Sequence, residues 1–116
     1  MSIENKIYTA LQSLVGGRAY PIIAPANTQR PFIVFSKNST AGIYTLLRAT
    51  QVSHVQYEVN IFDDDVKPLA DLETISKAAR IALENIGASL VDEASDRDEA
   101  TRLRRTRLSL SQYVRN

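Results

Sequence analysis

The pattern of apolar and polar residues is clearest between Val55 and Ile61, where the two kinds alternate. The apolar positions are Val55, Tyr57, Val59 and Ile61, and the polar positions between them are Gln56, Glu58 and Asn60. A period of two is typical of a strand with one face in the core and the other in water. The pattern therefore predicts a half-buried strand.

Three adjacent carboxylates, Asp63, Asp64 and Asp65, follow Phe62. Because like charges repel, we expect the strand to end here and the backbone to turn these carboxylates outward into water. Clustered carboxylates can hold a cation, but before a helix they more often cap it and offset its dipole. We therefore favour capping and solubility over a metal site.

A helix is predicted next. Asp65 is a candidate N-cap, and Pro68 fits the first turn, where its missing amide has no intrahelical partner. Apolar residues then recur at spacings of three and four, which places on one stripe Leu69, Leu72, Ile75, Ala79, Leu83 and Ile86. Gly87 ends the helix because glycine tolerates the left-handed conformation.

The N-terminal part predicts a shorter amphipathic helix, a loop and a strand. Ser2 is a candidate cap, and Gly16 and Gly17 end the helix. Its apolar stripe consists of Ile3, Ile7, Leu11 and Leu14. Prolines and Asn27 predict an ordered loop up to Pro31. The run Phe32–Ser36 is too apolar for alternation, so we expect a central strand with both faces covered.

The segment 37–50 has no clear helical or strand period. It exposes the apolar residues Ile43, Tyr44, Leu46 and Leu47, which have no evident local core to enter. We interpret it either as an irregular flap or as an extended hairpin arm that needs another subunit.

The C-terminal part predicts two strands joined by an acidic loop. The first strand covers 88–91, and the loop covers 92–99, where five of eight residues are acidic. In the last strand Leu108, Leu110 and Gln112 alternate with Ser109, Ser111 and Tyr113, with a bulge expected near Arg104 and Arg105. A hairpin across loop and strand would bring opposite charges close.

Composition limits the function more than it defines it. The 116 residues fit one domain (1–116), and a net charge of +1 gives no global attraction to nucleic acid or anionic membranes. The absence of cysteine excludes disulfides and thiol catalysis. No apolar run has the length of a membrane span, and the N-terminus lacks a secretory signal, so we expect assembly in the cytoplasm.

Candidate chemistry is sparse. His54 is the single histidine, and no further ligands are spaced to form a metal site with it. Arg105 and Arg107 would share one face of a strand and Arg104 the other, which splits their charge. No phosphate loop, nucleophile elbow or paired catalytic motif is present. We expect no enzymatic activity, no cofactor and no metal.

Taken in order, several motifs resemble the tail-completion or tail-to-head joining proteins of long-tailed bacteriophages, which are fold relatives of the tail terminators. The motifs are GGRAYP at 16–21, RPFIVFSK at 30–37, the strand VQYEVNIFDDD, the alanine-rich helix and the arginine-rich last strand. The resemblance extends from Ile3 to about Tyr113. GGRAYP matches the family's Gly-Arg-(small or β-branched)-Tyr-Pro pattern.

The resemblance implies an α+β fold, with a mixed or antiparallel sheet of about four to five strands and two α-helices packed on one face. The implied order is helix, strand, arm, strand, helix, strand, strand. It also implies a homo-oligomeric six-fold ring in the virion neck. Such a ring caps the tail tube protein, meets the head connector or head-closure protein, and lets genomic DNA pass without sequence-specific binding.

Two surfaces are candidates for these contacts. We expect the arm residues to pack on a neighbouring subunit or the tube; they are Ile43, Tyr44, Leu46 and Leu47. We expect charged residues to form part of the subunit or lumen surface; they are Asp63, Asp64, Asp65, Arg102, Arg104, Arg105 and Arg107. The alternatives are a small nucleic-acid-binding module that uses these arginines with Tyr113 for stacking, and a metal-assisted hydrolase using the aspartates and His54.

Overall fold

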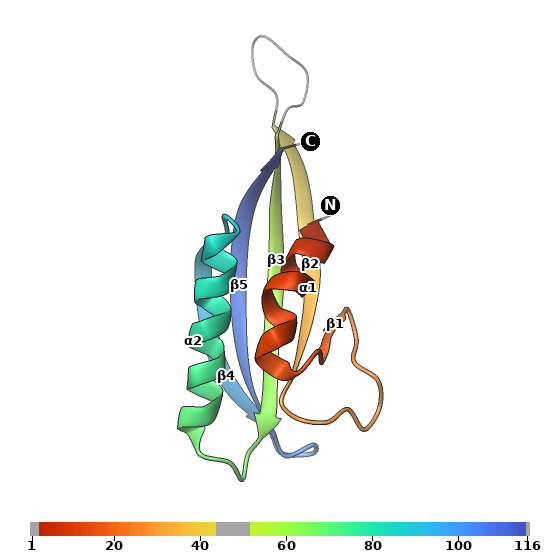
Figure 1. Cartoon of the computed structure of the whole chain (residues 1–116), viewed down its shortest axis with the longest axis vertical. Coiled ribbons are helices and arrows are strands. Elements are labelled where there is room, and N and C mark those ends of the chain that lie inside the picture. Colours follow the sequence, from red (N-terminus) through yellow and green to blue (C-terminus); the bar gives the residue numbers. More distant parts are fainter. Residues whose placement is uncertain (1–2, 44–51, 116) are drawn as a thin grey trace.

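The computed structural model describes residues 3–43 and 52–115 of the chain. In these residues, two α-helices pack on one face of a five-stranded mixed sheet (Figure 1). The elements are α1 Ile3–Leu11, a 3-10 turn Gln12–Val15, β1 Ala19–Pro21, β2 Phe32–Ile43, β3 Val52–Asp64, α2 Leu69–Asn85, β4 Ser89–Asp98 and β5 Leu103–Arg115. The predicted α+β class is confirmed, and the three-residue β1 is an addition.

The strand order across the sheet is β1-β2-β3-β5-β4. β1 is parallel to β2, and the other neighbours are antiparallel. α1 lies over the side of the sheet that contains β1 and β2, and α2 lies over the side that contains β4 and β5 (Figure 1). β1 and β4 are therefore the two edges of the sheet.

The core lies between the helices and the sheet. The predicted alternation in β3 is confirmed, because Val55, Tyr57, Val59 and Ile61 are all buried. The helices meet them with a buried stripe made of Ile3, Ile7, Leu11, Leu72, Ala79 and Leu83. The prediction for Leu69 was wrong, since this side chain is 48% exposed at the start of α2.

A buried polar chain links β3, β5 and the end of α2. The Tyr57 hydroxyl donates to Gln112 Oε1 at 3.1 Å, and Gln112 Nε2 donates to the Ile86 carbonyl at 2.7 Å. Burial raises the pKa of Tyr57 to about 12, because the phenolate would lose its hydration. Gly87 has φ +103°, which confirms the predicted left-handed residue after the helix.

The start of α2 differs from the prediction. Asp65 does not cap the helix; Pro68 occupies the N-cap position with extended backbone angles, and no side chain caps it. The strand before it continues through Asp64, and Asp63 is only 2% exposed. The expectation that all three carboxylates turn into water was therefore wrong. The predicted cap Ser2 lies outside the described residues.

β2 also differs from the prediction. It is longer than expected and pairs with β3 up to Ile43 opposite Val52, with an irregularity at Asn38. The described start of the segment 37–50 is thus part of a hairpin rather than an irregular flap. Both helices cover the same sheet face, so the opposite face of β2, with Phe32 and Val34, is only half-buried. The prediction that both faces of this strand are covered was therefore wrong.

The C-terminal hairpin corrects two further expectations. β4 continues to Asp98, so most of the predicted acidic loop is a strand. The bulge lies between Leu90 and Asp92, whereas β5 pairs with β3 without interruption past Arg104 and Arg105. The predicted inward positions of the last strand are confirmed, because Leu108, Leu110 and Gln112 are buried.

Candidate functional site

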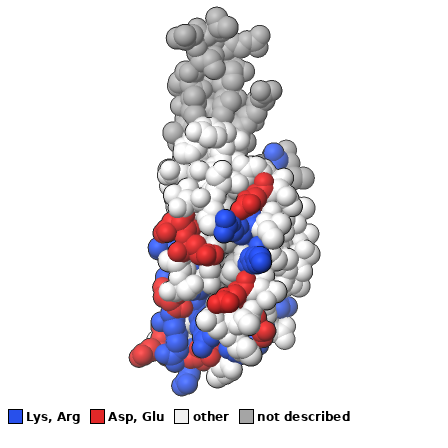
Figure 2. Space-filling model, turned by 90° about the vertical axis from the view of Figure 1, so that its left-hand side faces the viewer, with Lys and Arg blue, Asp and Glu red and all other residues white. Residues whose placement is uncertain are grey.

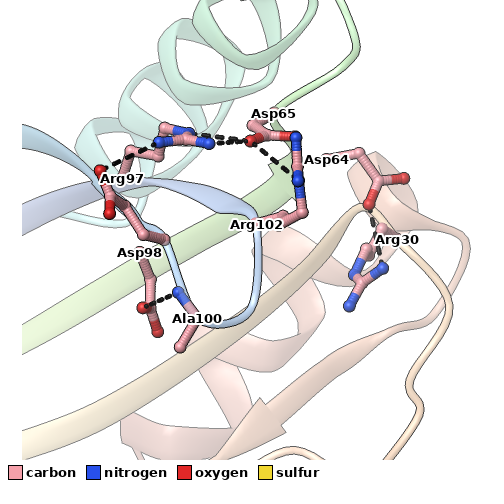
Figure 3. A network of polar contacts seen from close by, with 8 residues as sticks. Arg30, Asp64, Asp65, Arg97, Asp98, Ala100 and Arg102 are labelled. Atoms are coloured by element: carbon pink, nitrogen blue, oxygen red, sulfur yellow. Dashed lines mark hydrogen bonds and ion pairs between the residues drawn. The ribbon is translucent and has the colours of Figure 1, made fainter.

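A cluster of charged side chains lies where the end of β3 meets the turn between β4 and β5 (Figure 3). β3 supplies Asp63 and Asp64, and Asp65 follows directly. β4 supplies Arg97, and Arg102 precedes β5. The antiparallel pairing of these strands brings residues from distant parts of the sequence together. We call this group the charged end.

Asp65 is the centre of the charged end. Its Oδ2 accepts hydrogen bonds from Arg97 Nε at 2.8 Å and pairs with Arg97 Nη2 at 2.7 Å. Arg102 Nε lies 3.8 Å from the same oxygen. The hydrogen bond from Arg97, together with the nearby guanidinium charges, lowers the pKa of Asp65. This carboxylate therefore stays ionised at pH values below the usual range for an aspartate.

Backbone bonds fix the β4–β5 turn beside Asp65. Arg102 has φ +58°, and its N–H donates to the Asp98 carbonyl at 2.8 Å. Its carbonyl accepts from the Asp65 N–H at 3.1 Å, which ties the turn to the residue after β3. The Asp98 carboxylate accepts from the Ala100 N–H at 3.0 Å. The geometry of the charged end is thus held by main chain as well as side chains.

The other two predicted aspartates also have partners within the chain. Asp63 Oδ1 accepts the Asp64 N–H at 2.8 Å and pairs with Lys67 Nζ at 3.2 Å. Asp64 Oδ1 accepts from Arg30 Nη1 at 3.0 Å. The three aspartates therefore form contacts within the chain that contribute to the stability of the fold.

The predicted arginines are spread over different surfaces. Sheet register places Arg104 on the helix-covered face, and Arg105 and Arg107 on the opposite face, which confirms the predicted split. Arg105 binds Asp96 through two hydrogen bonds, one of them from Nε at 3.0 Å. This contact lowers the pKa of Asp96 and raises that of Arg105. Within the described part of the chain, the Arg107 Nε atom is buried without a hydrogen-bond partner.

Several residues of these networks were not predicted. Arg30, Asp96 and Arg97 complete ion pairs with predicted residues, yet each comes from another part of the sequence. The signal available was the acid-rich 92–99 segment followed by an arginine-rich strand. This signal indicated that acidic and basic side chains would meet in a hairpin, but it did not indicate which residues would pair.

A groove with a mixed apolar and polar lining was also not predicted. The loop 22–31 runs beside the free face of the sheet and encloses a groove of about 460 Å³. At its base Phe32 and Phe62 stack with ring centroids 4.9 Å apart. On its rim Ile22 and Ile23 are 78% and 77% exposed. Their signal in the sequence was two adjacent isoleucines inside a proline-rich loop, where a core position was improbable.

The remaining predicted residues give less information. Tyr44, Leu46 and Leu47 of the arm lie outside the described residues, and Ile43 is the last described residue before them. His54 is half-buried, with its ring centroid 4.8 Å from that of Tyr113. Within 3–43 and 52–115, no group of three or more His, Asp or Glu is placed to hold a metal ion. In the same residues, neither helix is long and apolar enough to cross a membrane.

The fold and these surfaces define a small α+β protein with a fixed charged end, a groove of mixed lining and two sheet edges. Neither a protein-family model nor a curated protein matches the sequence. A solved chain described as "Virion of native gene transfer agent (GTA) particle" is similar in structure, with a TM-score of 0.71 and 16% sequence identity. The match covers 99% of this chain and 96% of that chain. The two chains therefore share one fold over nearly their whole lengths.

Proposed function

We propose that this chain is a structural virion protein of a phage-like particle. The observation that carries the proposal is the whole-length fold similarity to a chain of a gene transfer agent virion. A match over 99% and 96% of the two chains leaves little in either without a counterpart. Because a fold can serve several functions, the surfaces and the sequence motifs must narrow the role.

The more specific role that we propose is a homo-oligomeric six-fold ring at the head-proximal end of a long tail. The ring would complete or terminate the tail tube and join it to the head connector. GGRAYP and the strand VQYEVNIFDDD with the helix after it support this role, because these motifs resemble the tail-completion proteins. The proposed protein acts by binding its neighbours in a fixed geometry. This role requires no cofactor and no catalytic turnover.

The candidate surfaces fit contacts between proteins. The arm from Ile43 to Leu47 would pack on a neighbouring subunit or the tube, and the charged end would face a subunit or the lumen. The ion pairs of Asp65 and Arg105 neutralise part of the charge within the chain. Passing DNA would therefore meet a surface whose positive charge is partly neutralised, which suits passage without tight binding.

Electron microscopy of a phage lysate that lacks only this protein tests the role. We expect filled heads beside unattached tails, and normal particles when the wild-type chain is supplied from a plasmid. Tails of abnormal length would support termination of the tube. Normal infectious virions without the chain would refute the proposed function.

The arm is tested separately by Leu46→Asp combined with Leu47→Asp. We expect the variant to fail in particle assembly, because two carboxylates would not pack in an apolar contact with another subunit or the tube. Unchanged virion yield would remove the arm from the proposed contacts. Circular dichroism of the purified variant is the control for folding.

A further inference from the structure

The two sides of the molecule carry opposite charge. Residues 3–37, which form α1, β1 and the first half of β2, contain four basic residues and one acidic residue. Residues 69–99, which form α2 and β4, contain eight acidic and three basic residues. These segments lie toward opposite edges of the sheet, the first toward β1 and the second toward β4 (Figure 1). Ion pairs join these segments to residues outside them, Arg30 to Asp64, Asp96 to Arg105 and Arg97 to Asp65. With these partners included, the net charge is +2 on the basic side, which ends in β1 (+3 − 1), and −5 on the acidic side, which ends in β4 (−5 + 1 − 1).

The acidic side is not uniformly negative. Figure 2 looks onto the side formed by α2 and β4, where acidic and basic side chains both appear. Lys77 and Arg80 of α2 share a shallow surface hollow with Glu73 and Glu93. The balance nevertheless remains acidic, and on β4 itself Asp92 and Glu93 are exposed.

Each side also exposes an apolar group at its edge. On the basic side, Ile22 and Ile23 follow β1, and on the acidic side Val91 is 66% exposed at the β4 bulge. Ile22 has φ +69°, a strained conformation for a β-branched residue. Its N–H donates to the Phe35 carbonyl at 2.8 Å, which holds the strained turn at the sheet edge.

These apolar groups lie at the same level along the strands. The Ile22 N–H bond to Phe35 places Ile22 beside Ser36. Strand register then runs across the sheet from Ser36 through Glu58 and Ser109 to Asp92, the neighbour of Val91. A second copy placed beside the first, without a shift along the strands, would bring Val91 of one copy against Ile22 and Ile23 of the other.

We propose that two copies of this chain join head to tail, the acidic β4 edge of one copy against the basic β1 edge of the next. The apolar groups Val91 and Ile22–Ile23 form the centre of this contact, and the opposite charges surround it. Because the joined surfaces differ, each copy keeps one free edge, so repetition generates a ring or an open chain. The inference rests on the proposed ring, for which it names the joining edges.

The charges and the bulge of β4 also have a simpler role, because both features protect edge strands from unwanted pairing. They would oppose contact between two β4 edges, where acid meets acid. They do not oppose a basic edge with an apolar centre. The same residues can therefore exclude the symmetric contact and favour the head-to-tail one.

The absence of cysteine allows a direct test with the purified full chain. Ile23→Cys and Val91→Cys proteins are mixed in equal amounts at low salt and oxidised, and disulfide-linked dimers are identified by mass spectrometry. We expect the 23–91 crosslink to exceed a control crosslink at least about tenfold, as a specific contact would require. The control pairs Ile23→Cys with Val66→Cys, because Val66 is 81% exposed and lies in the β3–α2 turn.

A charge reversal tests the electrostatic part. Glu93→Lys in the Val91→Cys protein should lower the 23–91 yield, and moderate salt should lower it in the parent pair. Asp71→Lys, in the first turn of α2 and outside the hollow that Glu93 lines, changes the net charge equally and should preserve most of the yield. Equal yields for the 23–91 and 23–66 pairs, or a predominance of 91–91 dimers, would overturn the proposal. Unattached tails in the deletion lysate together with that result would leave the proposed function standing and the edge assignment wrong.

Discussion

At the residue scale, Asp65 shows how context changes the role of a side chain. An aspartate shortly before a helix is a good candidate cap, but Pro68 lies between Asp65 and α2 and sets the start of the helix. The carboxylate instead accepts hydrogen bonds from Arg97, whose sequence position is 32 residues away. The partner depends on the β4–β5 turn, which local sequence patterns do not specify.

The Asp65 contact predicts a pH dependence of stability. The pKa of Asp65 is lowered in the folded chain, so its contribution is present at neutral pH. That contribution is lost as the pH falls through the unfolded pKa of about 3.9 toward the folded value. We expect Asp65→Asn to lower the free energy of unfolding at pH 7 and to have a smaller effect at pH 3.

Urea denaturation at both pH values measures this difference. Asp92→Asn, at an exposed position on β4, is the matched control and should resemble wild type at pH 7. An Asp65→Asn effect of equal size at pH 3 and pH 7 would show that the ion pair with Arg97 does not contribute.

Tyr57 gives a second prediction at this scale. Tyr57→Phe leaves the buried Gln112 Oε1 without its donor, which we expect to cost about 1 to 3 kcal/mol. The raised pKa of about 12 means that the folded chain favours the protonated phenol. Stability from this group is therefore present below the unfolded pKa of about 10 and is lost as the pH rises toward 12. Denaturation at pH 7 and pH 11 should show a smaller Tyr57→Phe effect at the higher pH.

At the element scale, sequence periodicity predicted the elements that bury one apolar face. β3, β5 and both helices have such a face, and their inward residues were mostly identified. β4 was predicted only as far as 88–91, because almost every side chain on this edge strand is exposed and no alternation marks its continuation to Asp98. β1 was missed because three residues are too few to show a period.

The register of β4 against β5 explains why the charged contacts were only partly predictable. The extra residue at the β4 bulge places Asp96 opposite Arg105. Without it, Asp96 would lie opposite Arg104 and face the other side of the sheet. The sequence indicated that acids and arginines would meet in a hairpin, but the position of the bulge decided the pairs.

The packing of α2 gives a prediction for this scale. Leu83 is fully buried against the sheet, so Leu83→Ala should lower the free energy of unfolding by about 2 to 5 kcal/mol. Ile81 lies on the same helix but is 51% exposed, and Ile81→Ala should change it by less than about 0.5 kcal/mol. Urea denaturation of the two variants measures the contrast. Similar losses would mean that α2 packs on the sheet through a different face.

At the scale of the whole molecule, the chain combines a one-sided helix–sheet core with opposite charges on its two sides. A core on one sheet face leaves the other face, with its groove beside the loop 22–31, to solvent or a partner. The opposite charges favour an ordered contact between copies over a random one. In the proposed role, these features let a small domain act through assembly with other copies of the chain.

Immunogold labelling of purified virions, with antibodies raised against this chain, tests the central claim most directly. The proposed role predicts gold particles at the junction of head and tail. The deletion lysate is the labelling control, because its heads and tails lack this chain and should carry no gold particles. Label along the tail tube, over the head surface, or absent from intact virions would contradict the proposed function.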